Sequence, residues 1–237
     1  MTDEPAAKPN HMIAFAVDCD RTLTGDDFIP DPEALFAVGE LRKAGFRCIL
    51  VTGRSKADLE RFSPLAEVFD AFVLEGGAVW GSWSTLLRPS NADIVLKAAE
   101  RVAEAGVAIE RRSTSFSASI NDLDVIRQQA SDCSIQLNVD RVDVLPPGLD
   151  KGIGLDGALG SLGIRGAHVV AIGDGENDVA LFDRAHVALA VANAVPSLKE
   201  CADEVLEAPG PGAVIDAVRR LLKGDWRTPN PVPAAAA

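Results

Sequence analysis

The sequence is poor in positive charge. Its 237 residues include 23 lysines and arginines against 35 aspartates and glutamates, which gives a formal net charge of -12 and an isoelectric point of about 4.7. A protein that attracts nucleic acid or an anionic membrane through its electrostatic field needs a basic surface. We therefore expect neither partner. A small anionic ligand would need local positive charge from a metal ion or a few well-placed cations.

Cysteine is also scarce, and long apolar runs are missing from the sequence. The four cysteines, Cys19, Cys48, Cys133 and Cys201, are far apart and form no Cys-x-x-Cys pair. This spacing favours free thiols in a reducing compartment. No apolar run reaches the length of a transmembrane helix, and residues 1–12 are too polar for a secretory signal. The expectation is a cytoplasmic protein.

Apolar strands and amphipathic helices alternate through residues 12–82 and again through residues 148–222. Strands that are apolar along their whole length, separated by helices, indicate a parallel sheet buried on both faces. The predicted fold class is therefore α/β, with a Rossmann-like parallel sheet and helices on both faces. Residues 1–11 and 223–237 are expected to be a flexible N-terminus and a flexible C-terminal tail.

The middle of the chain has a different pattern. Residues 83–147 contain a helical segment, two short strands, a second helical segment and two more strands. Short strands that follow one another closely are typical of antiparallel pairing. We expect a small α+β unit, inserted between the two halves of the parallel-sheet domain.

Oxygen-bearing side chains follow several of the predicted parallel strands. In open α/β sheets, ligands bind at the edge where the strands have their carboxyl ends. The residues expected at that edge are Asp18, Asp20, Thr52, Gly53, Glu75, Asp174 and Asp178. Asp18, Asp20 and Asp174 would together carry about three negative charges, which need a cation to remain ionised. Carboxylate and carbonyl oxygens are the ligands that suit Mg²⁺.

Four motifs, in order along the chain, resemble those of the haloacid dehalogenase-like hydrolases. They are "DCDRT" (18–22), Thr52 in "LVTGR", Lys151 in "LPPGLDKGIGL" and "GDGENDVAL" (173–181). The resemblance covers residues 13–222, although the insert matches only in its placement and strand pattern. An insert between the second and third motifs is similar to the cap of the Cof-like branch, which includes sucrose-phosphatase-like and archaeal phosphoglycolate phosphatase members.

The resemblance implies a role for each motif residue. Asp18 would be the nucleophile that forms an aspartyl-phosphate, and Asp20 would protonate the leaving alkoxide and then activate water. Thr52, Gly53 and Lys151 would hold the phosphoryl oxygens. The implied Mg²⁺ ligands are Asp18, the backbone carbonyl of Asp20, Asp174 and a supporting Asp178. Asn177 and Arg21 are further candidates for support.

The resemblance implies a Mg²⁺-dependent phosphatase that hydrolyses a small phosphorylated metabolite, such as a phosphosugar or phosphoglycolate. Two alternatives are a phosphotransferase that uses the same aspartyl-phosphate and a non-catalytic module that binds a phosphate ligand. Arg21 departs from the family, whose phosphatases usually have glycine at this position. Arg111 and Arg112 in the insert are candidates for contact with a substrate carboxylate, and the alternative is a solvated strand edge.

Overall fold

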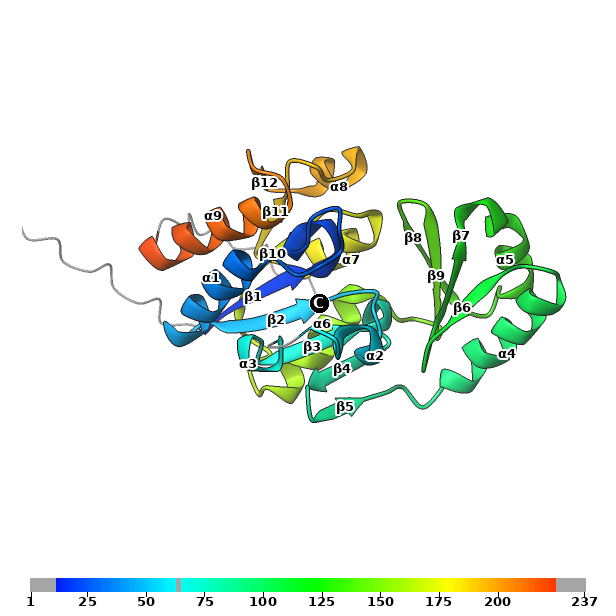
Figure 1. Ribbon diagram of the computed structural model, residues 1–237. Helices are drawn as coiled ribbons and strands as arrows, with labels where there is room; N and C mark the ends of the chain where they lie inside the picture. The colour runs from blue at the N-terminus through cyan, green and yellow to red at the C-terminus, as the bar shows by residue number, and fades with distance from the viewer. Residues whose placement is uncertain (1–11, 63–64, 225–237) are drawn as a thin grey trace, which may run out of the picture.

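The computed structural model describes residues 12–62 and 65–224, and its larger sheet has eight strands in the order β12-β11-β10-β1-β2-β3-β4-β5 (Figure 1). The six parallel strands are β1 (Ile13–Asp18), β2 (Arg47–Val51), β3 (Ala71–Leu74), β10 (His168–Gly173), β11 (Val187–Ala190) and β12 (Glu204–Val205). The hairpin of β4 (Val79–Ser82) and β5 (Thr85–Leu87) continues the sheet in antiparallel pairing.

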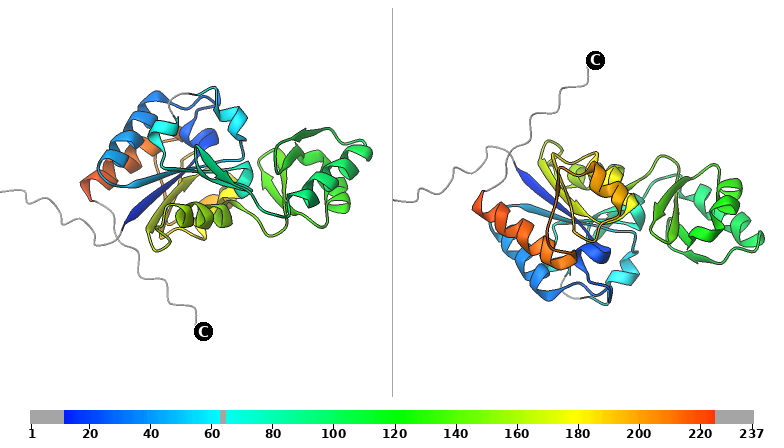
Figure 2. Two further views of the ribbon diagram at one scale, coloured as in Figure 1. Left: turned by 90° about the horizontal axis from the view of Figure 1, so that it is seen from below. Right: turned by 90° about the horizontal axis from the view of Figure 1, so that it is seen from above.

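Helices cover both faces of this sheet (Figure 2). The helices α1 (Pro32–Lys43) and α9 (Gly210–Lys223) pack together on one face, whereas α6 (Lys151–Ser161) and α7 (Val179–Phe182) lie on the other. Shorter helices occupy the connections: α2 (Lys56–Leu59), α3 (Leu65–Val68) and α8 (Pro196–Cys201). The central strand β1 is buried from Ala14 to Asp18, as expected for a strand with helices on both sides.

Local sequence signals fix where several helices begin. The Asp31 carboxylate accepts hydrogen bonds from the backbone N–H groups of Glu33 and Ala34, and Pro32 is the first residue of α1. A side chain in this position satisfies N–H groups that have no partner within the helix. Ser55 and Asp58 form a capping box that begins α2 after the loop that follows β2.

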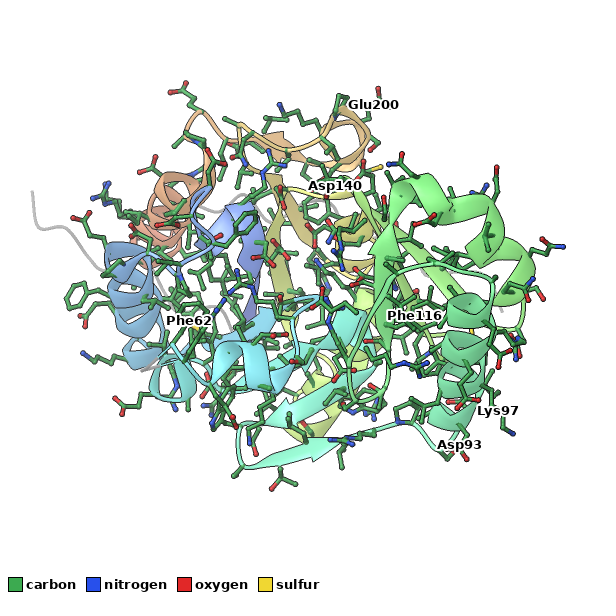
Figure 3. The ribbon with its side chains drawn as sticks, turned by 45° about the vertical axis from the view of Figure 1, so that its right-hand side comes forward. Phe62, Asp93, Lys97, Phe116, Asp140 and Glu200 are labelled. Atoms are coloured by element: carbon green, nitrogen blue, oxygen red, sulfur yellow. The ribbon has the colours of Figure 1, made fainter. Side chains whose placement is uncertain are left out.

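The second sheet has four antiparallel strands in the order β6-β7-β9-β8. Its elements are α4 (Ala92–Glu104), β6 (Ile109–Arg111), β7 (Phe116–Ser119), α5 (Leu123–Gln129), β8 (Ser134–Asn138) and β9 (Arg141–Leu145). We call this unit the cap. Phe116 is fully buried in its separate hydrophobic core, while Asp93 and Lys97 extend outward from α4 (Figure 3).

The fold class predicted from the sequence is confirmed: a Rossmann-like sheet carries an inserted α+β unit. The structure differs from the expected boundaries in one respect. The insert was expected to begin at residue 83, but β5 pairs with β4 in the large sheet, and the first cap helix begins at Ala92. The predictions for residues 1–11 and for most of the tail 223–237 lie outside the described residues, although α9 includes Lys223.

Across residues 12–62 and 65–224, none of the helices combines the length and the apolar character that crossing a membrane requires.

Candidate active site

The topology brings three sequence motifs to one edge of the large sheet. Strand β1 lies between β2 and β10, so Asp18 at the end of β1 has Thr52 on one side and Asp174 on the other. Lys151 comes from elsewhere, as the first residue of α6. The carboxyl edge predicted from the strand ends therefore gathers side chains from four distant parts of the chain.

Lys151 is the buried centre of this cluster. Its ammonium Nζ lies 2.8 Å from Asp18 Oδ1, 3.0 Å from Asn177 Oδ1 and 2.6 Å from Asp178 Oδ1. Only 1% of the Lys151 side chain is exposed. Burial alone would lower the Lys151 pKa, but the charges of Asp178 and Asp18 outweigh it and hold the pKa above its ordinary value. Lys151 is therefore a fixed positive charge.

Asp178 organises the loop that carries Asp174. Its Oδ2 accepts hydrogen bonds of 3.0 Å from the backbone N–H groups of both Asp174 and Gly175, while its Oδ1 accepts from Lys151. The carboxylate folds back so closely that a Cβ on Gly173 would lie 2.5 Å from Oδ2, and only glycine fits there. Because all these donors converge on Asp178, its main role in this arrangement is to position Asp174 and Lys151.

Asp18 and Asp174 each keep one unused oxygen. The Oδ2 atoms of both are buried and accept no hydrogen bond from the described part of the chain. One oxygen each of Asp18, Asp174 and Asp178 can be chosen so that all three atoms lie within 4.8 Å of one another. Asp18 and Asp174, which each keep an unpaired oxygen and lie this close to each other and to Asp178, fit a divalent cation that prefers oxygen ligands.

Burial of several carboxyl groups side by side raises the pKa of two of them. Burial, together with the nearby charge of Asp178, raises the Asp174 pKa from 3.8 to about 7, although Lys151 and Arg21 oppose the shift. Burial is also the main cause that raises the Asp18 pKa well above its ordinary value, and Asp178 adds to it. Without a further cation, these carboxyl groups therefore tend to hold protons.

The Asp20 side chain lies outside this cluster and pairs with Arg54. The Nε and Nη2 groups of Arg54 both donate to the Asp20 carboxylate, with an Nε–Oδ1 distance of 2.9 Å. Arg54 Nη2 also donates to the Phe28 carbonyl oxygen at 2.8 Å, and the guanidinium lies 5.4 Å from the centre of the Phe62 ring. The Arg54 side chain is only 11% exposed, so it fixes the direction of the Asp20 carboxylate.

Arg21 lies on the opposite side of the motif, next to Asp174. Its Nε is 3.7 Å from Asp174 Oδ2, and 31% of its side chain is exposed. The Arg21 backbone is in the left-handed region, with φ 59° and ψ 5°. Asn193 Nδ2 donates to the Arg21 carbonyl oxygen at 3.0 Å, which holds this turn in place.

The remaining predicted residues line the same edge. Thr52 is fully buried, and its Oγ1 accepts a hydrogen bond from the Arg54 backbone N–H. Gly53 faces the cap, because a Cβ at this position would lie 3.5 Å from Asp143 Oδ2. Asn177 is buried and contacts Lys151 through its Oδ1. The structure thus brings Thr52, Gly53 and Asn177 close to the Asp18 cluster or to the cap surface above it.

Two glutamates of the core hold the cap over this edge. Glu75 follows β3, and its buried carboxylate accepts five hydrogen bonds from the cap residues 113–115. Glu176 Oε2 accepts a hydrogen bond of 2.9 Å from the backbone N–H of Val139, at the turn between β8 and β9. The turns of both cap hairpins are therefore anchored to core carboxylates.

The two cap arginines differ in position. Arg112 is mostly buried, with Nη1 3.1 Å from Asp143 Oδ1, whereas Arg111 is exposed on β6. Arg112 Nε is buried and donates to none of the residues that the structure describes. Because Asp143 also faces Gly53, Arg112 belongs to the cap surface that approaches the core, and Arg111 does not.

Arg54 was not among the residues predicted for the site, and Glu75 was predicted at its edge without a role or a partner. Arg54 stands two residues after Thr52 in "LVTGR", and Glu75 ends a buried strand, so position was a signal for both. Their partners could not be inferred. The Asp20–Arg54 pair spans 34 positions, and the contacts of Glu75 with the cap span 38 to 40.

Comparisons with known proteins agree with this geometry. A model of the family described as haloacid dehalogenase-like hydrolase matches residues 116–218. Phosphoglycolate phosphatase from Methanothermobacter thermautotrophicus is 31% identical over 219 residues, which cover 89% of this chain and 99% of that protein. Phosphoglycolate phosphatase 2 from Saccharolobus solfataricus is 29% identical over 230 residues, covering 92% of this chain and 95% of that protein.

Solved structures extend the similarity to the whole architecture. A sugar phosphatase of HAD subclass IIB superimposes with a TM-score of 0.74 at 17% identity, covering 90% of this chain and 100% of that one. A HAD phosphatase from Bacteroides thetaiotaomicron also gives a TM-score of 0.74 at 17% identity, with 94% and 100% covered. At this level of identity, the similarity establishes a shared fold of core and cap.

Proposed function

The chain belongs to the haloacid dehalogenase-like hydrolase family, and from that premise we propose that it is a Mg²⁺-dependent phosphatase that works through an aspartyl-phosphate on Asp18. At the coarser level it is a phosphoric monoester hydrolase of small phosphorylated metabolites. The observation that supports the finer proposal best is the buried cluster of Asp18, Lys151 and Asp174.

Asp18 would act as the nucleophile. Its Oδ1 is held by Lys151, while its Oδ2 is free to attack phosphorus. A new bond would form between Oδ2 and phosphorus as the bond to the leaving alkoxide breaks. Because the Lys151 ammonium is fixed beside Asp18, it would stabilise negative charge on the transferring phosphoryl oxygens. Thr52 and Gly53 would hold the same oxygens from the neighbouring strand end.

Asp20 would move the proton. In the first step it would give a proton to the leaving alkoxide. In the second it would take a proton from the water that attacks phosphorus, while the bond between Asp18 Oδ2 and phosphorus breaks and inorganic phosphate leaves. The pairing with Arg54 keeps the Asp20 carboxylate away from the Asp18 cluster. This separation supports two different roles for two carboxylates that are only two residues apart.

Asp18 and Asp174 would hold the Mg²⁺ ion, with the Asp20 backbone carbonyl as a further ligand and Asp178 in support. The unpaired buried Oδ2 of Asp174 supports this site, as does the distance of at most 4.8 Å between one oxygen from each of Asp18, Asp174 and Asp178. When bound, Mg²⁺ would neutralise charge on the nucleophile and on the phosphate.

We propose phosphoglycolate or a similar phosphorylated hydroxy acid as the substrate. The similarity to proteins named phosphoglycolate phosphatase extends over core and cap, with 88–92% of this chain covered in three of them. Arg112 supports this choice, because its Nε donates to none of the described residues and its ion-pair partner Asp143 faces Gly53. A guanidinium there would attract the carboxylate of the substrate.

The test is release of inorganic phosphate from 2-phosphoglycolate, from a panel of phosphosugars and from an aryl phosphate. We expect hydrolysis that needs Mg²⁺, stops with EDTA and is lost in Asp18→Asn, with the highest kcat/KM for phosphoglycolate. Activity that survives EDTA or Asp18→Asn would contradict the mechanism. A preference for a neutral phosphosugar would contradict only the substrate. Phosphorylation of an added acceptor alcohol would show that the enzyme also transfers the phosphoryl group.

A further inference from the structure

Arg21 stands where the backbone turns left-handed directly after the Asp18–Asp20 segment. Its φ of 59° is a conformation that glycine adopts freely and that arginine rarely adopts. Two other contacts hold this turn: the Arg21 N–H donates to Thr24 Oγ1 at 2.9 Å, and Asn193 donates to the Arg21 carbonyl. These contacts thus impose the turn, and the turn sets the direction of the Arg21 side chain.

The turn directs the guanidinium to Asp174. Arg21 Nε and Asp174 Oδ2 form an ion pair at 3.7 Å, a distance slightly too long for a hydrogen bond. Asp174 Oδ2 is buried and accepts no hydrogen bond within residues 12–62 and 65–224. Two cations therefore compensate the acidic cluster from opposite sides: Lys151 contacts Asp18, and Arg21 approaches Asp174.

We propose that Arg21 lowers the affinity of this site for Mg²⁺, because its guanidinium and the ion compete for the Asp174 carboxylate. The inference rests on the proposed function, which places Mg²⁺ between Asp18 and Asp174. A bound divalent ion would repel the guanidinium, and Coulomb interactions between charges a few ångströms apart remain considerable near a protein surface. Since 31% of the Arg21 side chain is exposed, the guanidinium has a path to solvent when the ion binds.

The consequence is a site that fills only at a higher Mg²⁺ concentration than the same acids would otherwise require. Arg21 also has a benefit in the metal-free protein, where it partly neutralises Asp174. It therefore acts on the metal site through Asp174 and is a positioning residue, with no contact to the reacting atoms required.

The test measures Mg²⁺ binding in the absence of substrate by isothermal titration calorimetry. Arg21→Gln removes the charge, and Arg21→Lys keeps it, while both variants retain the same unfavourable backbone conformation. We expect Arg21→Gln to lower the Kd for Mg²⁺ about tenfold, and Arg21→Lys to stay within about twofold of the wild type. Arg21→Asn, whose side chain tolerates the left-handed region, should behave like Arg21→Gln and replaces it if folding fails.

Asp174→Asn separates this inference from the proposed function. Loss of Mg²⁺ binding in Asp174→Asn, with unchanged or weaker binding in Arg21→Gln and Arg21→Asn, would overturn the competition and leave the metal site intact. A wild type that binds no Mg²⁺ would overturn both. The proposal would also be overturned if Arg21→Lys lowered the Kd for Mg²⁺ as much as Arg21→Gln does, because charge would then not be the cause.

Discussion

The Lys151 ammonium lies 2.8 Å from the Asp18 carboxylate, although 133 positions separate the two residues in the chain. The same ammonium contacts Asp178, which in turn holds the Asp174 loop. One buried charge therefore connects the proposed nucleophile to the proposed metal ligand.

Lys151→Met should reduce both activity and stability. Without the ammonium, Asp18 and Asp178 lose their buried partner, which costs about 3–5 kcal/mol of unfolding free energy for a buried ion pair. Loss of a fixed charge beside the phosphoryl group should lower kcat by about 10²–10³-fold. Thermal unfolding and steady-state kinetics measure these effects. Lys97→Met, the same change on the exposed side of α4, should alter neither, and an equal effect there would contradict the assignment.

Arg54→Gln should affect the proton-transfer step. Asp20 would lose its paired donors and its fixed direction, so we expect kcat to fall by about 10²-fold, the cost of a misplaced catalytic group. Arg54→Lys should recover part of the loss. Arg61→Gln is the matched control, because Arg61 also lies over the Phe62 ring, at 4.7 Å, but is exposed. Wild-type kcat in Arg54→Gln would remove the positioning role.

Glu75→Gln should loosen the cap. An amide offers one acceptor oxygen in place of two, so several of the donors in residues 113–115 would be left without a partner, at a cost of about 1–3 kcal/mol. Hydrogen–deuterium exchange should show less protection at residues 113–115, with the core strands unchanged. Glu67→Gln, at an exposed position of α3, should leave that protection as it is. Unaltered exchange in Glu75→Gln would show that other contacts hold the cap.

The metal-free protein should lose stability as the pH rises. The Asp174 pKa is about 7 in the folded chain and 3.8 in an ordinary environment, so the folded state binds this proton more tightly. Its contribution is complete below about pH 4 and disappears as the pH rises through about 7. In EDTA, the midpoint of thermal unfolding should therefore fall between about pH 5 and pH 8.

Mg²⁺ should oppose this loss. Metal binding requires the ionised carboxylate, so Mg²⁺ should raise the unfolding midpoint more at about pH 8 than at about pH 6. Asp174→Asn should flatten the pH dependence measured in EDTA and remove the effect of Mg²⁺. An identical slope in this variant would assign the pH dependence to other groups.

Arg112→Gln should discriminate between substrates. Its guanidinium is proposed to attract the substrate carboxylate, so kcat/KM should fall at least tenfold more for 2-phosphoglycolate than for an aryl phosphate, which has no carboxylate. Arg111→Gln, on the exposed part of β6, is the matched control and should not change this ratio. Equal losses on both substrates would assign Arg112 a structural role through Asp143.

The edge of the sheet that carries the site was predictable because it depends on strand order and strand ends. Asp18, Thr52 and Asp174 each follow an apolar run, and parallel strands place such residues together. The hairpin of β4 and β5 was missed, because its short strands are only partly buried and contain the glycine Gly81. Such a segment has no clear periodicity, so the sequence alone assigned part of it to the insert.

Side-chain pairing was the part that sequence could not provide. Asp20 was predicted beside Asp18, and only Cys19 separates them in the chain, yet the Asp20 side chain turns to Arg54. That choice depends on where the loop after β2 places a guanidinium and on the Phe28 carbonyl that holds it. Contacts of this kind arise from tertiary packing and have no period or spacing along the chain.

The short linker from the cap to α6 has one glycine in the left-handed region and one residue held by contacts with the core. The chain leaves the cap after β9 and reaches Lys151 within six residues, by way of Gly148 in the left-handed region. Asp150 stands between them: its side chain caps the helix, and its carbonyl lies so near Gly77 that a Cβ there would be 1.9 Å away. Asp150 is therefore fixed through both its side chain and its carbonyl, one residue before Lys151. If the cap moves, we expect the linker to bend at Gly148 and the position of Lys151 to stay unchanged.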